Sequence, residues 1–244
     1  MQFKETLEKV HKHVDKHFQN HLKKVQEYVR QPSISADGTG IKETAEMTKG
    51  FIEEIGGSSK VVPTDGWPVV YGEIFAEAEK TLLIYGMYDV QPVEEEKGMW
   101  VVPPFGGKVI DVKPFGKCLV NRGAINTKAP LRAFFNACQS ILKVEGKLPV
   151  NLIFAIEGEE ELGSIHLPQF VQKYEKKLAK ANAVFFPSAA QDPKGKVILE
   201  LGVKGIIYLE LISKGGEWGG PTTRGIHSGN AAWVDSPYGS SSGR

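Results

Sequence analysis

The segment LLIYGMYDVQP, residues 82–92, carries most of the information about the fold, because an apolar strand ends in it and polar side chains follow directly. Tyr88, Asp89 and Gln91 come just after that strand, and open α/β sheets bind their ligands beyond the carboxyl ends of their strands. A second apolar strand, VNLIFAI, precedes the adjacent carboxylates Glu160 and Glu161. The sequence therefore predicts acidic chemistry at strand ends, which is where a hydrolase would place it.

Helical and strand-like patterns alternate along the rest of the chain. Apolar residues at helical spacing predict helices over residues 4–30, 42–55, 129–144 and 167–178. Strands are expected within residues 60–86, in GKVIDV, CLVNR, PVNLIFAIE, ANAVFF and KVILEL, and in IIYLELISK from Ile206. This alternation favours the α/β class, with a layered, mostly parallel central sheet and helices on both faces.

The same patterns suggest how the chain is divided. Residues 1–204 are expected to form a catalytic-type α/β domain that lacks its C-terminal segment. Residues 205–237 would begin a smaller α+β lid or dimerisation domain, and the polar residues 238–244 resemble a flexible tail or a cloning remnant. We therefore expect the chain to be truncated.

Composition excludes several classes of protein. The 244 residues carry a formal net charge of +1 and are 41% hydrophobic, as in ordinary soluble domains. We expect no nucleic-acid partner because no basic stripe is present. We expect no membrane span because no apolar run approaches about 20 residues. Cys118 and Cys138 form no CxxC pair and the N-terminus lacks a signal-peptide core, so the predicted location is the cytoplasm.

Three histidines stand out in the first predicted helix. His13, His17 and His21 follow one another at four-residue spacing, beside the apolar side of the helix. A pair of histidines at this spacing can chelate a metal, but a catalytic zinc helix would add the glutamate of HExxH. Without that glutamate, a solvated helix face is the preferred interpretation.

Four motifs in order give the chain a family resemblance. They are MYDVQP (87–92), WVVPPFGG (100–107), NRGAINTKAP (121–130) and EGEEELGS (157–164). The chain resembles the zinc-dependent aminoacylase, carboxypeptidase and dipeptidase family (peptidase family M-twenty), which reads HYDVQP, RGxxDxKG and EGEEEIGS. The likeness extends roughly from Val25 to His227 and implies a metal-dependent hydrolase.

The resemblance assigns a role to each matching position. Met87 stands where a histidine binds the first metal, and Asp89 where an aspartate orients that histidine. Asn126 stands where a carboxylate bridges both metals. Glu160 matches the general base that activates a metal-bound water, and Glu161 matches a ligand of the second metal.

Three further positions follow from the same resemblance. Pro187 and Ser188 occupy the stretch after ANAVFF where another acidic ligand is expected. His227 matches a histidine of the lid domain that contacts the substrate carboxylate or the oxyanion, often across a dimer. The family's last ligand, a C-terminal histidine, has no counterpart in this sequence.

These replacements change what the site is expected to bind. Zinc takes nitrogen, thiolate and carboxylate ligands, whereas a thioether suits Cu(I) and an asparagine offers only a neutral carbonyl oxygen. Zinc is the cofactor that the resemblance implies, yet full occupancy of two metal sites is not expected. A single-metal site using Glu161, Asp89 or His227 remains open.

Structural interpretations of the same residues also remain open. Without the family, Met87 is a core residue that caps a strand, and Asp89 and Asn126 are ordinary turn formers. The three glutamates 159–161 would then be a solvated helix start.

Three functions are consistent with the sequence. The first is a hydrolase of amide bonds in small peptides or N-acyl amino acids, with impaired activity in this chain and a homodimer as the full-length form. The second is a non-catalytic homologue that binds a small carboxylate or a protein partner. The third is a metal-free hydrolase that uses Glu160 and His227.

Overall fold

The computed structural model describes residues 2–93, 98–188, 194, 196–202, 205, 207 and 209–211. The chain divides into two units, residues 1–200 and residues 201–244, and the description below concerns the first. His227 and almost all of the expected lid domain lie outside the described residues, so the predicted domain boundaries stay predictions.

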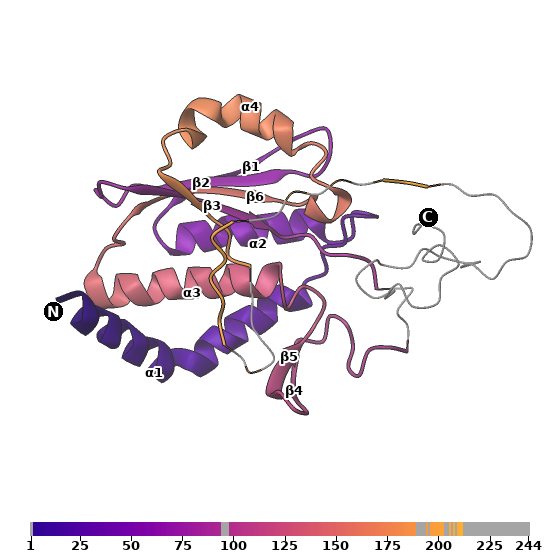
Figure 1. Ribbon diagram of the computed structural model, residues 1–244, viewed down its shortest axis with the longest axis horizontal. Helices are drawn as coiled ribbons and strands as arrows, with labels where there is room; N and C mark the ends of the chain where they lie inside the picture. The colour runs from indigo at the N-terminus through magenta and orange to yellow at the C-terminus, as the bar shows by residue number, and fades with distance from the viewer. Residues whose placement is uncertain are drawn as a thin grey trace, which may run out of the picture. The chain divides into compact units, whose positions relative to one another are not determined.

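The first unit is built on a five-stranded sheet with the order β1-β2-β6-β3-β7 (Figure 1). Its strands are β1 (Ser58–Val62), β2 (Val69–Ile74), β3 (Thr81–Met87), β6 (Asn151–Glu157) and β7 (Ala183–Phe185). The pairs β6–β3 and β3–β7 are parallel, while β1–β2 and β2–β6 are antiparallel. Only β2 therefore runs against the other strands, and the predicted mostly parallel sheet is confirmed.

Helices cover both faces of this sheet, as predicted. On one face α2 (Ile41–Glu54) and α3 (Lys128–Glu145) pack against the strands, and α1 (Gln2–Arg30) lies outside them against α3 (Figure 1). The opposite face carries α4 (Leu167–Leu178). A layered α/β architecture follows, with one apolar core on each side of the sheet.

The larger core lies between the sheet and the helices α2 and α3. Phe135 of α3 is fully buried, and its ring stacks on Phe154 of β6 with centroids 5.5 Å apart. Tyr28 of α1 meets Phe51 of α2 edge to face at 4.8 Å. These contacts join three helices to the central strands. The smaller core, under α4, is formed by Tyr71, Phe170 and Tyr174 with aliphatic neighbours.

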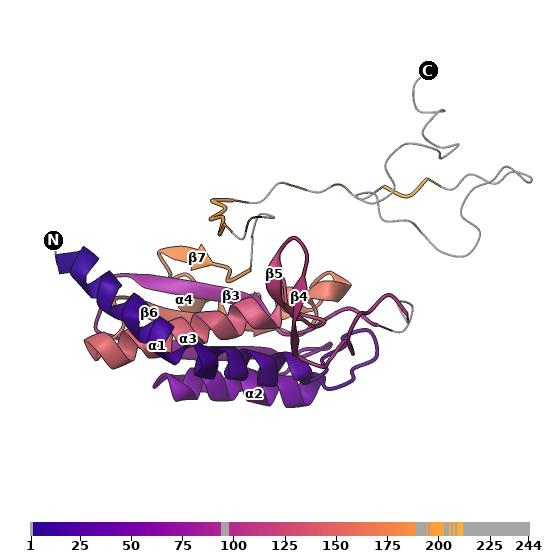
Figure 2. The same ribbon diagram turned by 90° about the horizontal axis from the view of Figure 1, so that it is seen from below.

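A separate two-stranded hairpin stands beside the end of the main sheet where α3 begins. It consists of β4 (Lys108–Val112) and β5 (Gly116–Val120), which pair antiparallel (Figure 2). Asn121, directly after β5, ties the hairpin to α1, because its amide donates to the Val29 carbonyl at 2.8 Å and its oxygen accepts from the Gly107 amide at 2.7 Å. The hairpin therefore has a fixed place next to the NRGAINTKAP loop.

Two expectations from the sequence need correction. The predicted strand KVILEL does not form, since residues 196–201 are irregular apart from a single bridge at Val197, and their apolar side chains are exposed, Leu201 at 94%. The glutamates 159–161 do not begin a solvated helix either: Glu159 is buried, and residues Glu160–Leu162 form a single 3-10 turn, η2. IIYLELISK lies largely outside the described residues. None of the described helices is long and apolar enough to cross a membrane.

Candidate active site

The candidate site lies at the carboxyl ends of β3 and β6, which are parallel neighbours. Their register places Met87 opposite Glu157, and the Tyr88 amide donates to the Glu157 carbonyl at 2.8 Å. The two acidic segments that follow these strands therefore leave the sheet side by side. This juxtaposition puts both motifs at one edge of the sheet.

Asp89 connects the two segments. Its carboxylate is fully buried and accepts the backbone amides of Glu160 and Glu161 at 3.2 and 3.0 Å. The Ser35 side chain also donates to it. Burial outweighs these hydrogen bonds and raises the pKa of Asp89 to about 7. Asp89 thus fixes the position of the 3-10 turn η2 and is not an ordinary exposed turn former.

The two glutamates of η2 differ in their surroundings. The Glu161 carboxylate accepts the Gln91 side-chain amide at 3.1 Å, and the Glu161 carbonyl accepts the same group at 2.9 Å. Burial raises the pKa of Glu160, and the nearby charges of Glu161 and Glu157 raise it further. A raised pKa brings a carboxyl group closer to the range in which a general base works at neutral pH.

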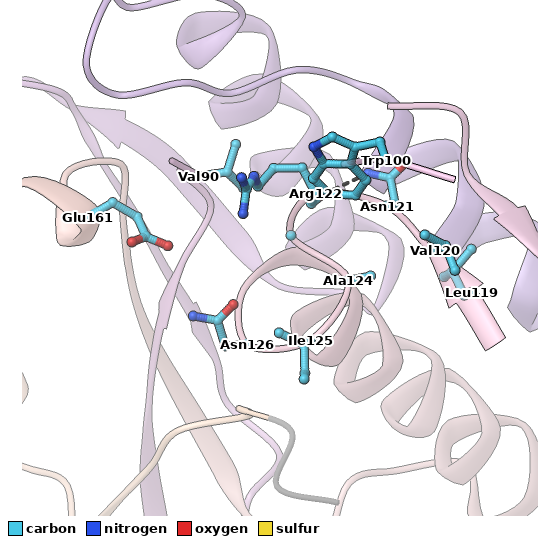
Figure 3. Close-up of a pocket in the computed structure, with 11 residues that line it drawn as sticks. Val90, Trp100, Leu119, Val120, Asn121, Arg122, Ala124, Ile125, Asn126 and Glu161 are labelled. Atoms are coloured by element: carbon cyan, nitrogen blue, oxygen red, sulfur yellow. Dashed lines mark hydrogen bonds between the residues drawn. The ribbon is translucent and has the colours of Figure 1, made fainter. Parts of the chain in front are cut away.

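A pocket of about 300 Å³ opens beside Glu161. Asn126 and Arg122 line it from the loop before α3, and Trp100 lines it from the WVVPPFGG segment. In Figure 3 the Glu161 carboxylate, the Asn126 amide and the Arg122 guanidinium point toward the same space. Arg122 lies 5.2 Å from the centre of the Trp100 ring and donates to the Pro92 carbonyl at 3.1 Å. The pocket therefore carries a positive group and a negative group.

Two buried glutamates, Glu157 and Glu159, help to hold this edge of the sheet together. Glu157 accepts Tyr85 Oη at 2.5 Å and Ser164 Oγ at 2.9 Å, and burial raises its pKa. Glu159 pairs with Nδ1 of His166 at 2.9 Å. Family motifs contain Ser164 but gave no reason to couple it to Glu157, and His166 lies beyond the motif. Sequence reasoning missed these partners because the contacts arise only when the chain turns after β6.

Lys128 is a further residue that the sequence did not single out. Its side chain is fully buried, its Nζ donates to the Gln31 carbonyl, and Nζ lies 5.0 Å from the centre of the Tyr28 ring. Burial lowers its pKa to about 7. Lys128 links the start of α3 to the loop after α1. That loop in turn contacts the segment after β3, where the Val90 amide donates to the Ser33 carbonyl at 2.9 Å.

Comparison with known proteins gives the chain a family. The family model described as peptidase family M20/M25/M40 matches residues 83–210, which is more than half of the chain. The chain belongs to this family. The match includes the MYDVQP, NRGAINTKAP and EGEEELGS motifs, whose polar residues build the site described above.

Similar proteins of the M20 family are metal-dependent peptidases by name. The Cys-Gly metallodipeptidase dug1 of Schizosaccharomyces pombe is 29% identical over 231 residues, which are 87% of this chain and 47% of that protein. The M20 family metallo-carboxypeptidase Sso-CP2 of Sulfolobus solfataricus has a TM-score of 0.63 at 40% identity, covering 72% of this chain and 39% of the other. Human carnosine dipeptidase 1 has a TM-score of 0.66 at 26% identity, covering 74% and 40%. The chain spans less than half the length of these relatives.

The residues present do not fit the two-metal centre expected for an M20 peptidase. Met87, at the position of the first ligand, is only 4% exposed, and its thioether is a poor zinc ligand. Asn126 is exposed at the pocket but carries no charge. At the end of β7, Pro187 is buried and Ser188 is exposed. Within the described residues, no group of three histidine, cysteine, aspartate or glutamate side chains is arranged to hold a metal ion.

The predicted site residues are therefore only partly brought together. Asn126 and Glu161 line one pocket, and Asp89 holds the backbone of Glu160 and Glu161. Met87 does not line that pocket. It lies two residues before Asp89 at the buried end of β3.

Proposed function

We propose that the protein binds small peptides or N-acyl amino acids in the pocket beside Glu161, and that this chain hydrolyses them slowly or not at all. One observation carries the proposal: the pocket pairs the Glu161 carboxylate with the neutral Asn126 amide, while Met87 is buried at the strand end. A dication at this place would lack the charged ligands that it requires.

The hydrogen bonds of the acidic residues support this proposal. Asp89 is engaged by two backbone amides, Glu161 by Gln91, and Glu159 by His166. Glu157 is engaged by Tyr85 and Ser164. Carboxylates that already accept protein donors have less need of a cation to satisfy them. This edge of the sheet is thus stabilised largely by protein donors.

The charges in the pocket favour a zwitterionic ligand. Glu161 can attract an ammonium group, and the Arg122 guanidinium on the Trp100 ring can attract a carboxylate. The names of two relatives point to the same class, since one is a Cys-Gly metallodipeptidase and another, from human, is a Beta-Ala-His dipeptidase. We therefore extend the proposal to dipeptides with free termini.

A second candidate is slow hydrolysis without a metal, with Glu160 as the base and His227 on the substrate. It is favoured by the place of Glu160 after β6, where the buried Asp89 carboxylate accepts its backbone amide at 3.2 Å and burial raises the pKa of its own carboxyl group. His227 lies outside the described residues. Turnover that persists with a chelator and is lost in Glu160→Gln would favour this candidate over binding alone.

A metal analysis tests the main proposal. The purified chain should retain well under one equivalent of zinc, measured by elemental analysis after incubation and desalting. The double variant Met87→His/Asn126→Asp restores two ligand types at the positions that the resemblance assigns to metal ligands, and it should retain about one equivalent. The single variant Asn126→Asp controls for a loss of folding at the buried position. Two equivalents of zinc in the unmodified chain would contradict the proposal.

A binding measurement tests the ligand class. Calorimetric titration with Cys-Gly and with Beta-Ala-His should show binding without turnover. Glu161→Gln should weaken it about tenfold, as expected for the loss of one charged contact. Glu175→Gln, on the exposed side of α4, is the matched control and should leave affinity unchanged. Equal affinity in both variants would place the ligand elsewhere.

Two further features belong to this proposal and have their own tests. We propose a cytoplasmic location, to be checked by fractionation of the native cells. We propose a homodimer for the full-length protein, to be checked by sedimentation, because the resemblance places a substrate-contacting histidine, His227, across a dimer.

A further inference from the structure

A second pocket lies far from the carboxyl edge of the sheet, between α1, the end of α2 and the last part of α3. It measures about 850 Å³, and we call it the histidine pocket. Its polar lining consists of His13, Asn20, His17, His21, Lys24, Glu54, Gln139 and Lys143. Gln139 and Lys143 lie more than ten residues after the first residue of α3, so the helix separates this pocket from Asn126 by about 20 Å.

The three histidines form a continuous stripe on α1. Residues four apart lie on one face of a helix, and the rings of His13 and His17 have their centres 4.4 Å apart, with His13 and His21 at 6.5 Å. All three side chains are half-buried. The expected solvated helix face is therefore partly covered, because residues at the end of α2 and on α3 line the same pocket.

Two ring nitrogens in this stripe have unused hydrogen-bonding capacity. Nδ1 of His13 and Nδ1 of His21 are buried and have no hydrogen-bond partner among the residues that the structure describes. The other nitrogen of His21, Nε2, lies 3.2 Å from Ser140 Oγ on α3. Buried polar atoms are normally paired, so the two imidazoles are incompletely satisfied by protein groups in the part of the chain that the structure describes.

The charges around the stripe are mostly positive. Lys16 and Lys24 on α1 and Lys143 and Arg132 on α3 all act on these histidines. The facing carboxylate, Glu54 at the end of α2, is already engaged: it accepts Arg132 at 2.9 Å and Gln139 at 2.7 Å. Burial, followed by these neighbouring positive groups, lowers the pKa of both His13 and His21.

We propose that the histidine pocket binds a small oxyanion that carries two negative charges. Lys143 supplies fixed positive charge, the histidines supply charge that appears on protonation, and Asn20 supplies a neutral donor. Lys24 adds positive charge beside them, although its Nζ donates to Gln139 Oε1 at 2.8 Å and lies 4.0 Å from Glu54. A divalent cation does not suit the same place. The described residues hold no three-ligand group there, and the lysines would repel it.

This assignment has a thermodynamic consequence. An anion favours the protonated form of each histidine, so its binding raises the pKa values that burial and the lysines have lowered. By linkage, the anion must then bind more tightly as the pH falls through the range in which these histidines titrate. A rise of one unit in the pKa of one histidine corresponds to about tenfold tighter binding at the lower pH.

Sulfate is the probe for the test, because it stays doubly charged over the whole range and any pH dependence comes from the protein. Side-chain NMR signals of the histidines are titrated in the full chain, with sulfate or with chloride at matched ionic strength. Sulfate should raise the pKa values of His13 and His21 and should bind about tenfold more tightly near pH 6 than near pH 8. The exposed His11 and the partly exposed His166 should respond equally to both salts.

Variants give the second arm of the test. Lys143→Gln and His17→Gln should each weaken sulfate binding about fivefold or more, whereas His11→Gln, on the exposed side of α1, should leave it unchanged. Circular dichroism checks that each variant is folded. If His17→Gln does not fold, Lys143→Gln alone tests the proposal. Equal shifts at His11, equal affinity in all variants, or shifts with zinc but not with sulfate would overturn the proposal.

Discussion

The ammonium group of Lys128 is buried in the interior, beside the candidate site. Its side chain is fully buried, Nζ donates to the Gln31 carbonyl, and the Tyr28 ring lies 5.0 Å away. Burial lowers its pKa from 10.5 to about 7. The variant Lys128→Met keeps an unbranched apolar stem and removes the charge, so the pair of proteins isolates the contribution of the ammonium group.

The sign of the effect follows from proton linkage. Between pH 7 and 10.5 the unfolded chain binds more protons at this lysine than the folded chain, so the free energy of unfolding rises with pH across this window. That contribution is lost as the pH falls toward the folded pKa. The slope is at most about 1.4 kcal/mol per pH unit. The unmodified protein should therefore gain about 2 kcal/mol between about pH 7 and about pH 9.

Lys128→Met should lack this gain. At neutral pH the variant no longer buries a charge, which favours folding. It also loses the hydrogen bond to the Gln31 carbonyl, which is worth about 1.5–3 kcal/mol. The pH dependence of the free energy of unfolding is therefore a sharper test than the stability at any one pH. Urea unfolding followed by circular dichroism at three pH values gives the free energies. Lys173→Met, at an exposed position of α4, is the control and should parallel the unmodified protein. Parallel profiles for Lys128→Met as well would refute the reasoning, since Lys128 would then have an ordinary pKa.

Four other substitutions have outcomes that the packing determines. Asp89→Ala leaves the two backbone amides at the start of η2 without their acceptor, so their hydrogen exchange should accelerate and unfolding should become about 2–4 kcal/mol easier. Gly158→Ala pushes a methyl group into the Tyr88 ring and should cost about 1–3 kcal/mol in urea unfolding, whereas Gly50→Ala, in α2 with open space around it, should stabilise by about 0.5–1 kcal/mol. Phe135→Ala empties the centre of the larger core and should lower the free energy of unfolding by about 3–5 kcal/mol.

Local patterns predicted most elements of the fold. The spacing of apolar residues gave the helices over residues 4–30, 42–55, 129–144 and 167–178, and the structure shifts their ends by at most two residues. KVILEL failed because an apolar strand pattern is stable only with a neighbouring strand to pair with, and residues 196–201 form a single bridge, at Val197, rather than a strand. The antiparallel direction of β2 was not predicted either, since pairing partners are set by tertiary contacts.

The sequence predicted the candidate site about as fully as it predicted the fold. Motifs at two strand ends predicted acidic residues there, and the parallel pairing of β3 with β6 then brings Asp89, Glu160 and Glu161 to one edge of the sheet. They did not indicate the roles of Lys128 or Glu159. Each depends on a partner from a distant or irregular segment, the Gln31 carbonyl and the His166 ring. Composition and periodicity carry no information on such contacts.

The carboxylates at the carboxyl edge of the sheet carry negative charge that other groups must offset. Asp89, Glu157 and Glu160 all have raised pKa values, and burial is the first cause in each case. A bound dication would lower these values, but Met87 and Asn126 deprive it of the ligands that it needs. Protons and protein donors are left to offset the carboxylates. Restoring the ligands in Met87→His/Asn126→Asp should therefore make zinc and protons compete, so that zinc retention by the variant falls as the pH drops.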